Sequence, residues 1–585
     1  MPRFLLITLL YFCCSAVLAQ STDHRFDDLA NRFVDEFPAL SPVNATKLGD
    51  HRYDGELDDI SNGARAKAST FYRQYLAQVN SIPRDALSRA NQVDHALLTH
   101  HLLEQIWRIE KLQEWAWNPL AYTKLCGSAV YGLMAREFAP EPQRLSHVAD
   151  RLAHFPRLYS QIRKTLEPKR VPRIHAETAI KQNRGVISIL DNMVVPRLGE
   201  LSESQRKRLQ AAMKTAKESV EEHQQWLESD LLPNASGDFR LGRERYKEKL
   251  AFTLHASGSQ DEIRKRAVLE LRRVREQMYD ISKEVYKKEF PFTSFPAKPD
   301  AAYQQAIVRA CLEMAYQELP ARGEIVDAAR ESLKLATEFV RNKEIVTLPP
   351  DPINIIVMPE FQRGVTLAYC DSPGALDVGQ KTFYAVAPLP RSWSDRQVRS
   401  YLREYNVRSV HNLTVHEAMP GHFVQLAHSN RYKSKLRAVL SSGAFIEGWA
   451  MYTEQVMVDQ GFLDGDPLMH LIVLKWYLRG IANAILDQAI HTDGISRDQA
   501  MRLMMEETFQ EEREAAGKWI RAQLTAAQLS TYFVGYIEHV DLRRETEQAW
   551  GKRFKLKTYH DRVLSFGSPP VKFAQALLLD KEIPQ

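Results

Sequence analysis

Apolar residues recur at helical spacing along the first half of the chain, and this periodicity constrains the fold more than any other feature. From Thr22 to about Asn342, apolar residues three or four positions apart alternate with charged residues, as in the segments that begin at Asn91 and Ser204. We therefore predict a mainly α-helical fold, with residues 20–345 forming an N-terminal helical half. Because proline is tolerated at a helix start but not in its interior, helices are expected to begin or end at Pro119, Pro140, Pro142 and Pro172.

The sequence changes character near Val346. Three prolines and a short β-branched run follow, and two further strand candidates begin at Thr366 and Thr382, separated by a stretch that contains glycine and proline. A sheet of two to four strands is therefore expected inside a helical protein. Helices resume afterwards, so residues 346–585 form a second half, which we expect to fold with the first as one cooperative unit.

The composition excludes several classes of function. With 44% hydrophobic and 26% charged residues, the chain resembles a soluble globular protein with a large core. Its formal charge of +5, from 78 basic and 73 acidic residues, is too balanced to indicate a nucleic-acid-binding protein, and no motif of that class is present. Beyond Ala19 only Cys126, Cys311 and Cys370 remain, too few for a disulfide scaffold and too widely spaced for a cysteine zinc site.

The segment from Met1 to Ala19 has the pattern of a secretory signal peptide. Arg3 gives a positive start, an apolar stretch runs from Phe4 to Val17, and a small-x-small pattern ends at Ala19. The apolar stretch is shorter than the roughly 20 residues that a membrane-spanning helix needs, although an uncleaved anchor is the alternative. We expect cleavage after Ala19, a secreted or periplasmic protein of a bacterial envelope, and no stable membrane insertion afterwards.

The segment HEAMPGH, residues 416–422, has the residue types of a zinc site. In the motif HExxH two histidines bind zinc and the glutamate activates a water, but here His422 comes six residues after His416 instead of four. Six residues turn a regular helix by about 240°, so an undisturbed helix cannot direct both imidazoles at one ion. Pro420 and Gly421 suit a two-residue bulge, because proline lacks a backbone N–H and glycine tolerates unusual dihedral angles. The helix must therefore be deformed if the histidines share a metal.

A third metal ligand is needed, because catalytic zinc keeps three protein ligands and one open position. Glu447, 25 residues after His422, is the best candidate, since it lies in a helical stretch with an apolar opposite face, next to Gly448. Glu454 lies two turns further on the same face and suits a role in orienting a ligating histidine. His428 continues the six-residue spacing, but three ligands at that period cannot be reached from one helix.

These motifs resemble those of a large bacterial family, the domain of unknown function 885, whose signatures have the forms HExxPGH and EGWAxYxE. The second corresponds to EGWAMYTE from Glu447. Stretches that begin at Leu48, Leu241, Ser372 and Tyr559 also resemble family landmarks, so the resemblance covers essentially the mature chain. The family is grouped with the gluzincin zinc peptidases. The resemblance therefore implies a mainly α, gluzincin-like helical fold with a deep central cleft and a small β-sheet near the metal-binding helix.

The same resemblance implies roles for the site residues, and residues 346–585 would form the catalytic half. One Zn²⁺ ion would be bound by His416, His422 and Glu447, with Glu417 as general base. This chain departs from the family pattern DTGxH in the segment that ends at His491, which bears on substrate preference. The residues alone leave the oxyanion donor open among Tyr532, Tyr536, His491 and His560. The resemblance favours Tyr532, with His491 second.

We predict from these residues a zinc peptidase that cleaves peptides by metal-activated water, with Glu417 as base. The peptide substrate would lie as an added strand beside Thr382–Pro388, the candidate sheet edge, although that segment also suits an internal strand. Two alternatives stay open: a zinc amidase or esterase that acts on a non-peptide bond, and an envelope binding protein without catalysis. The complete set of ligands and base argues against the second alternative.

Overall fold

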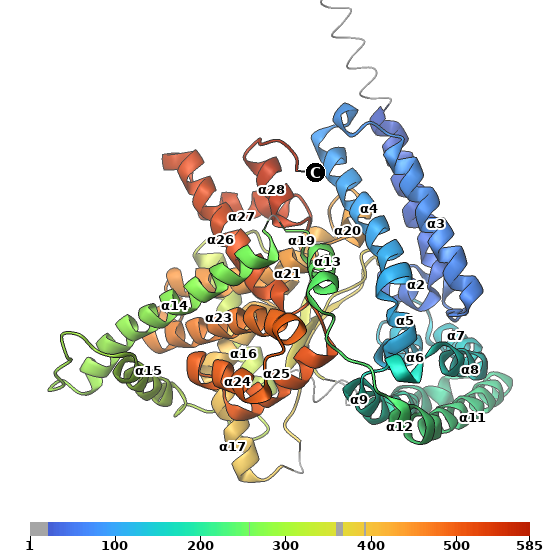
Figure 1. The fold of residues 1–585 in the computed structure, drawn as a ribbon, viewed down its shortest axis with the longest axis horizontal. Helices are drawn as coiled ribbons and strands as arrows, with labels where there is room; N and C mark the ends of the chain where they lie inside the picture. Colours follow the sequence, from blue (N-terminus) through green and yellow to red (C-terminus); the bar gives the residue numbers. More distant parts are fainter. Residues whose placement is uncertain (1–21, 257, 359–366, 391–392, 585) are drawn as a thin grey trace, which may run out of the picture.

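The computed structural model describes residues 22–256, 258–358, 367–390 and 393–584 of the chain. The predicted signal peptide, residues 1–19, lies outside the described residues. Most described residues are helical, and one three-stranded sheet is present among them (Figure 1). The predicted mainly α fold with a small sheet is therefore confirmed.

The helices within residues 22–234 lie together on one side of the molecule (Figure 1, blue to teal). Prolines mark their starts as expected: α6 begins at Pro119, Pro140 is the N-cap of α7, and Pro172 is the N-cap of α9. The elements are a helix over residues 22–36 and α2 (Pro42–Leu48), α3 (Asn62–Asn80), α4 (Arg89–Trp107), α5 (Glu114–Trp117), α6 (Pro119–Met134), α7 (Glu141–Ala153), α8 (Phe155–Thr165), α9 (Arg173–Asn183), α10 (Gly185–Ile189), α11 (Glu203–Trp226) and α12 (Leu232–Asn234).

The remaining helices form a larger body around the sheet (Figure 1, green to red). Before the sheet come α13 (Arg243–Leu254), α14 (Gln260–Glu289), α15 (Ala301–Ala315) and α16 (Ile325–Asn342). After it come α17 (Asp395–Glu404), α18 (Val407–Glu417), α19 (His422–Ser429), α20 (Lys435–Val439), α21 (Gly443–Asp459), α22 (Phe462–Gly465), α23 (Pro467–Gln488), α24 (Arg497–Arg502), α25 (Glu512–Leu524), α26 (Ser530–Trp550), α27 (Leu556–Leu564) and α28 (Val571–Leu578).

The sheet has the strand order β1-β3-β2, with β1 at Ile353–Val357, β2 at Ala368–Asp371 and β3 at Thr382–Val386. The central strand β3 pairs in parallel with β1 and antiparallel with β2. The expectation that Thr382–Pro388 forms a sheet edge is therefore wrong. Both sides of β3 are used by neighbouring strands, and its mostly buried side chains fit this central place. Among the described residues the outer strand beside α18 is β2.

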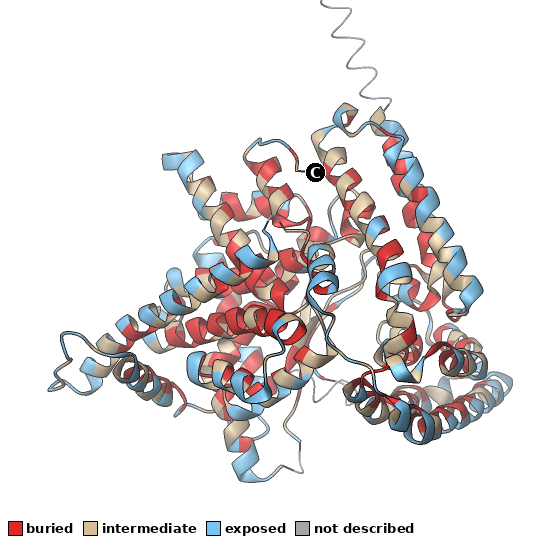
Figure 2. Cartoon of the chain, viewed as in Figure 1, coloured by how far each residue is buried: buried red, intermediate tan, exposed pale blue. Residues whose placement is uncertain are grey.

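Three large clusters of buried apolar side chains hold the helices together. The largest draws on residues 246–578 and fills the body around the sheet, where Figure 2 shows the buried residues concentrated. The second draws on residues 43–235. The third joins residues 26–102 to Leu436, so the N-terminal helices pack against the second half of the chain. The largest core includes residues on both sides of position 345, and the division of the chain into two halves there stays a prediction.

Two further sequence features can be compared with the structure. Within the described residues, no helix is both long and apolar enough to cross a membrane. The cysteines at positions 126, 311 and 370 are free thiols, and two of them are buried. Packing of apolar side chains, and not cross-linking, therefore holds the described fold together.

Candidate metal centre

The helix that carries HEAMPGH is interrupted inside the motif. Helix α18 ends at Glu417 and α19 begins at His422. In the interruption the N–H of Gly421 donates to the carbonyl of Val415 (2.9 Å), and a β-carbon at Gly421 would overlap the carbonyl oxygen of His416. The predicted deformation is therefore present, but it is a break over residues 418–421 and not the two-residue bulge that we expected. Glycine is required at 421 because the chain passes too close to α18 for any side chain.

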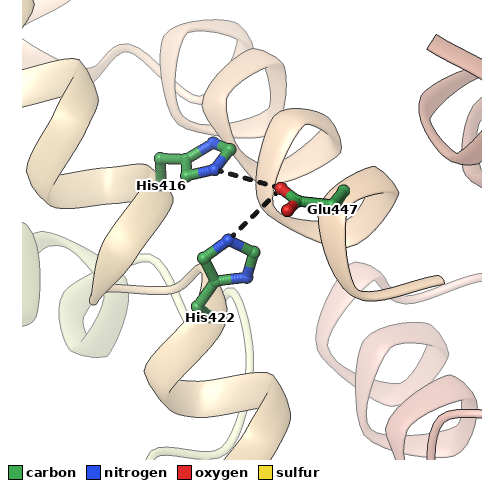
Figure 3. Close-up of side chains that lie close together, drawn as sticks. All are labelled: His416, His422 and Glu447. Atoms are coloured by element: carbon green, nitrogen blue, oxygen red, sulfur yellow. Dashed lines mark ion pairs between the residues drawn. The ribbon is translucent and has the colours of Figure 1, made fainter. Parts of the chain in front are cut away.

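The break brings three side chains from three helices to one point (Figure 3). His416 lies near the end of α18, His422 at the start of α19 and Glu447 in the first turns of α21. Their ligand atoms all lie within 4.8 Å of one another. The Nε2 atoms of His416 and His422 are 3.7 and 3.5 Å from Oε2 of Glu447, and Figure 3 shows both rings directed at this carboxylate. Two imidazole nitrogens and a carboxylate oxygen are the donor set of many catalytic zinc sites.

The orientation of His416 is fixed by a carboxylate behind it. Nδ1 of His416 lies 2.6 Å from Oε1 of Glu454, and the side-chain amide of Asn412 donates to Oε2 of the same carboxylate (2.7 Å). A proton held on Nδ1 by Glu454 leaves the Nε2 lone pair directed at Glu447, as a metal ligand requires. The role expected for Glu454 thus matches its contacts. His422 lacks such support, because its Nδ1 is buried without a hydrogen-bond partner among the described residues.

Glu417 lies beside the three ligand candidates and is held by the edge of the sheet. The backbone N–H of Cys370 in β2 donates to Oε2 of Glu417 (2.9 Å). Only 9% of the residue is exposed, and this burial raises the pKa of Glu417, while the nearby His422 and His416 act in the opposite direction. A carboxylate with a raised pKa, directly next to a metal site, is suited to accept and return a proton.

Tyr532 completes the group that the structure brings together. It lines a cavity of about 110 Å³ that is also lined by His416 and Glu417. Burial raises the pKa of Tyr532, and the charge of Glu447 acts in the same direction, so its hydroxyl stays protonated beside the carboxylate. The hydroxyl accepts a hydrogen bond from Nη2 of Arg521 (3.3 Å). Tyr532 can therefore offer its O–H to a group in this cavity.

The structure places His491 elsewhere. It lies in the π-helical segment Ala489–Asp493 that follows α23, stacks on Tyr246 with ring centroids 5.6 Å apart, and is hydrogen-bonded through Nε2 to the carbonyl of Thr525 (2.8 Å). Among the described residues that line the cavity beside Glu417, His491 is absent. The two remaining candidates also have other contacts: Tyr536 packs on Tyr477, and His560 contacts the hydroxyl of Tyr452 and the carbonyl of Ile345.

Sequence reasoning missed several groups at the site. The backbone N–H of Cys370 could not be found from its sequence, because its place depends on how β2 lies against α18. Three cations, Arg479, Lys518 and Arg521, also line the cavity. A weak signal for two of them exists, since Lys518 and Arg521 are three residues apart and so share a helix face. Such a charged face more often points to solvent.

Glu447 is positioned by a very close crossing of α21 and α26. Gly448 on α21 faces Gly535 on α26, and a β-carbon on either glycine would overlap the backbone of the other helix. Nε2 of His539 on α26 also lies 3.1 Å from the carbonyl of Phe445 on α21. Gly448, next to Glu447, thus permits a close backbone approach, and the crossing holds this carboxylate against the histidines.

We predict that Gly535→Ala destabilises the protein by about 1–3 kcal/mol, because the added methyl group must push the two helix backbones apart. Chemical denaturation followed by circular dichroism would measure the change. Gly517→Ala is the matched control. Gly517 lies inside α25 with open space around its β-carbon position, so alanine there should be neutral or stabilise by about 0.5–1 kcal/mol. Equal stability of the two variants would contradict the close crossing.

Known bacterial proteins share the sequence pattern and the fold of this chain. The family model described as "Bacterial protein of unknown function (DUF885)" matches residues 42–578. A solved structure of a candidate lipoprotein of unknown function from Shewanella oneidensis is 32% identical to this chain, with a TM-score of 0.80 over 95% of this chain and 99% of that one. A candidate lipoprotein from Colwellia psychrerythraea, 17% identical, shares the fold with a TM-score of 0.76 over 96% and 99% of the two chains. No curated protein matches the chain.

Proposed function

The chain belongs to the DUF885 family of bacterial proteins of unknown function, and from the geometry of its site we propose that it is a zinc-dependent peptidase. One observation carries the proposal: His416, His422 and Glu447 converge from three helices to within 4.8 Å, directly beside the buried carboxylate of Glu417. The 25-residue step from His422 to Glu447 resembles the ligand spacing of gluzincins, so the relation to that superfamily and its deep cleft form part of the proposal.

The three residues fit a zinc ion because they offer suitable ligand atoms and because one of these atoms has no hydrogen-bond partner among the described residues. Oε2 of Glu447 is buried without a hydrogen-bond partner among the described residues, and the two imidazole nitrogens that face it are farther away than a good N–H···O hydrogen bond. A buried carboxylate oxygen left in this state is costly unless a cation joins it. Three protein ligands leave one coordination position open. A bound zinc ion supplies Lewis acidity and lowers the pKa of a water molecule.

The chain's own residues then divide the work of hydrolysis. Glu417 takes the proton from the attacking water and returns it to the leaving amine. Burial raises the pKa of Glu417, and the hydrogen bond from the N–H of Cys370 holds its carboxylate in place for this transfer. Tyr532 donates its hydroxyl proton in a hydrogen bond to the carbonyl oxygen as negative charge develops there. The outer strand β2 replaces Thr382–Pro388 as the proposed place where an extended peptide lies, since β2 both borders the sheet and contacts Glu417.

The proposed location is the bacterial envelope or the medium outside the cell. The segment from Met1 to Ala19 carries the pattern of a signal peptide. The relative from Shewanella oneidensis is described as a candidate lipoprotein, which supports a location outside the cytoplasm for this chain. A peptidase there would meet peptides and small proteins of the envelope or the surroundings.

The proposal is tested with zinc-loaded, chelator-treated and zinc-reconstituted protein, each incubated with a diverse peptide library and with matched ester and non-peptide amide substrates. We expect one zinc ion per chain and peptide fragments that disappear on chelation and return with zinc. Cleavage of only the esters or non-peptide amides would favour the zinc amidase or esterase. Stoichiometric zinc without any hydrolysis would favour a binding protein, and the absence of stoichiometric zinc would refute the metal site.

We predict that Glu454→Gln lowers zinc affinity by roughly 10–100-fold, because the amide no longer holds the Nδ1 proton of His416 as a carboxylate does. Competition with a chromogenic chelator would measure the affinity. Glu331→Gln is the control, because this substitution removes the same charge from an exposed position on α16, away from the site. Unchanged zinc affinity in Glu454→Gln would show that this contact does not support the metal.

A further inference from the structure

One wall of the cavity beside Glu417 is lined by cations. Arg479 comes from α23, and Lys518 and Arg521 come from one face of α25. Among the described residues, only one carboxylate forms ion pairs with them: Oε1 of Glu514 lies 2.5 Å from Nη2 of Arg479 and 3.9 Å from Nζ of Lys518. The wall therefore carries more positive than negative charge where it faces the proposed catalytic groups.

Three other acidic residues near this wall make their contacts elsewhere. Glu404 is bound by the ammonium group of Lys475 (2.8 Å). Glu454 is bound by His416, and Glu417 accepts the N–H of Cys370. Among the described residues, none of these three carboxylates forms an ion pair with Lys518 or Arg521, the cations from α25.

Lys518 and Arg521 are the cations with the least compensation. Lys518 is only 5% exposed, and its nearest carboxylate oxygen is beyond hydrogen-bonding distance. Burial and the neighbouring Arg479 lower the pKa of Lys518 well below its ordinary value. Within the described part of the chain, Arg521 donates to neutral groups, the side chain of Gln528 (2.9 Å) and the hydroxyl of Tyr532 (3.3 Å). A buried cation without a close anion is costly, so an anionic ligand would gain strongly from binding here.

The cavity is small, and one of its lining residues has a hydrogen-bond donor without a partner among the described residues. The indole nitrogen of Trp476, which lines the cavity, is buried without a hydrogen-bond partner among the described residues. A volume of about 110 Å³ is well below the roughly 300–1,000 Å³ of sites that enclose a whole drug-sized ligand. The space suits the end of a chain better than a peptide that continues in both directions.

We propose that this cationic wall binds the C-terminal carboxylate of the peptide substrate, so that the protein acts as a carboxypeptidase that removes residues from the C-terminal end. The inference rests on the proposed peptidase function. In the reaction the water oxygen bonds to the scissile carbonyl carbon and the C–N bond breaks. The protons of water end on the departing amine and in the new carboxyl group, or in solvent when that group ionises. Arg521, through its bond to Tyr532, links the bound carboxylate to the oxyanion donor.

Binding is tested separately from cleavage. Two libraries of acetylated random pentapeptides, one with free C-terminal carboxylates and one with C-terminal amides, are dialysed against zinc-loaded Glu417→Gln protein, and retained peptides are quantified by mass spectrometry. Because charge-assisted hydrogen bonds differ from neutral ones by a kcal/mol or more, we expect free acids to be retained about tenfold or more better than amides. Wild-type protein should release residues from the C-terminal end of the free acids and leave the amides intact.

Variants on α25 test whether the cationic wall causes the preference for free acids. Lys518→Met should remove most of the preference for free acids, and Lys518→Arg should keep it, since the charge remains. Arg513→Gln is the matched control, because it removes one charge from the exposed side of the same helix. A melting curve for each variant shows whether it folds.

Equal retention of acids and amides would overturn the carboxylate site, whether or not the peptides are cleaved. Cleavage of both libraries at interior bonds would do the same and leave the proposed peptidase standing. Retention of amides rich in Asp and Glu would also overturn the inference, since the wall would then bind acidic side chains. A strong preference for free acids without any hydrolysis would support the carboxylate site and refute the peptidase.

Discussion

Glu417→Gln is expected to lower the rate of peptide hydrolysis on the order of 10²–10⁴-fold and to leave zinc stoichiometry unchanged. Glutamine keeps the size of the side chain and an oxygen that can accept the N–H of Cys370. It cannot accept the proton of the attacking water, so the loss falls on the chemical step. Since Glu417 is not one of the three converging ligand candidates, the metal should stay bound.

The measurement compares kcat and kcat/KM of wild type and Glu417→Gln on one cleaved peptide, with zinc quantified in both samples. A general base acts in the transition state, so kcat and kcat/KM should fall together and KM should change little. Glu331→Gln, on the exposed face of α16, should behave like wild type. If Glu417→Gln digests the peptide as fast as wild type, Glu417 is not the base.

The parts of the fold that sequence could predict are those set by local chemistry. Helical periodicity located the helices, and Pro119 and Pro172 marked two of their starts, because the restriction that proline imposes does not depend on distant contacts. That the helix is deformed between Glu417 and His422 could be predicted for the same reason, because the preferences of Pro420 and Gly421 are local, but the form of the deformation, a break instead of a bulge, could not.

The arrangement of the strands could not be predicted in this way. The segment at Thr382–Val386 has the composition of a strand in any position, and local pattern does not decide which neighbours it pairs with. Both of its partners, β1 and β2, precede it in the chain, and only the folded chain shows β3 lying between them. For the same reason the sequence suggested β3 as the strand beside which a peptide would lie, whereas the folded chain has β2 at the edge of the sheet.

The candidate site likewise has parts that local sequence reveals and parts that depend on tertiary packing. The ligand candidates and Glu454 stand in two short motifs, so their residue types and spacing revealed them. The wall of Arg479, Lys518 and Arg521 depends on the packing of α23 and α25 around the cavity, which no motif encodes. The family resemblance gave His491 the second place as oxyanion donor, but in the structure His491 stacks on Tyr246 and is not among the described residues that line the cavity.

Removal of a ligand should have the largest effect of all on the metal. His422→Ala is expected to reduce zinc to well below one ion per chain and hydrolysis to the level of chelator-treated protein. Two ligands from α18 and α21 would remain, and the loss in affinity should exceed the roughly 10–100-fold expected when only a supporting carboxylate is changed. His422 makes no hydrogen bond through Nδ1 among the described residues, so its removal breaks no such bond there.

His428→Ala is the matched control for this loss, because His428 lies on the same helix α19, six residues after His422. It is solvent-accessible, and its Nε2 contacts the carbonyl of Thr347 at 2.9 Å, away from the three converging side chains. Metal analysis by mass spectrometry after dialysis should find zinc retained in His428→Ala and lost in His422→Ala. Full zinc content in both variants would mean that His422 is not a ligand. The break in the helix at Pro420 and Gly421 would then need an explanation other than metal binding.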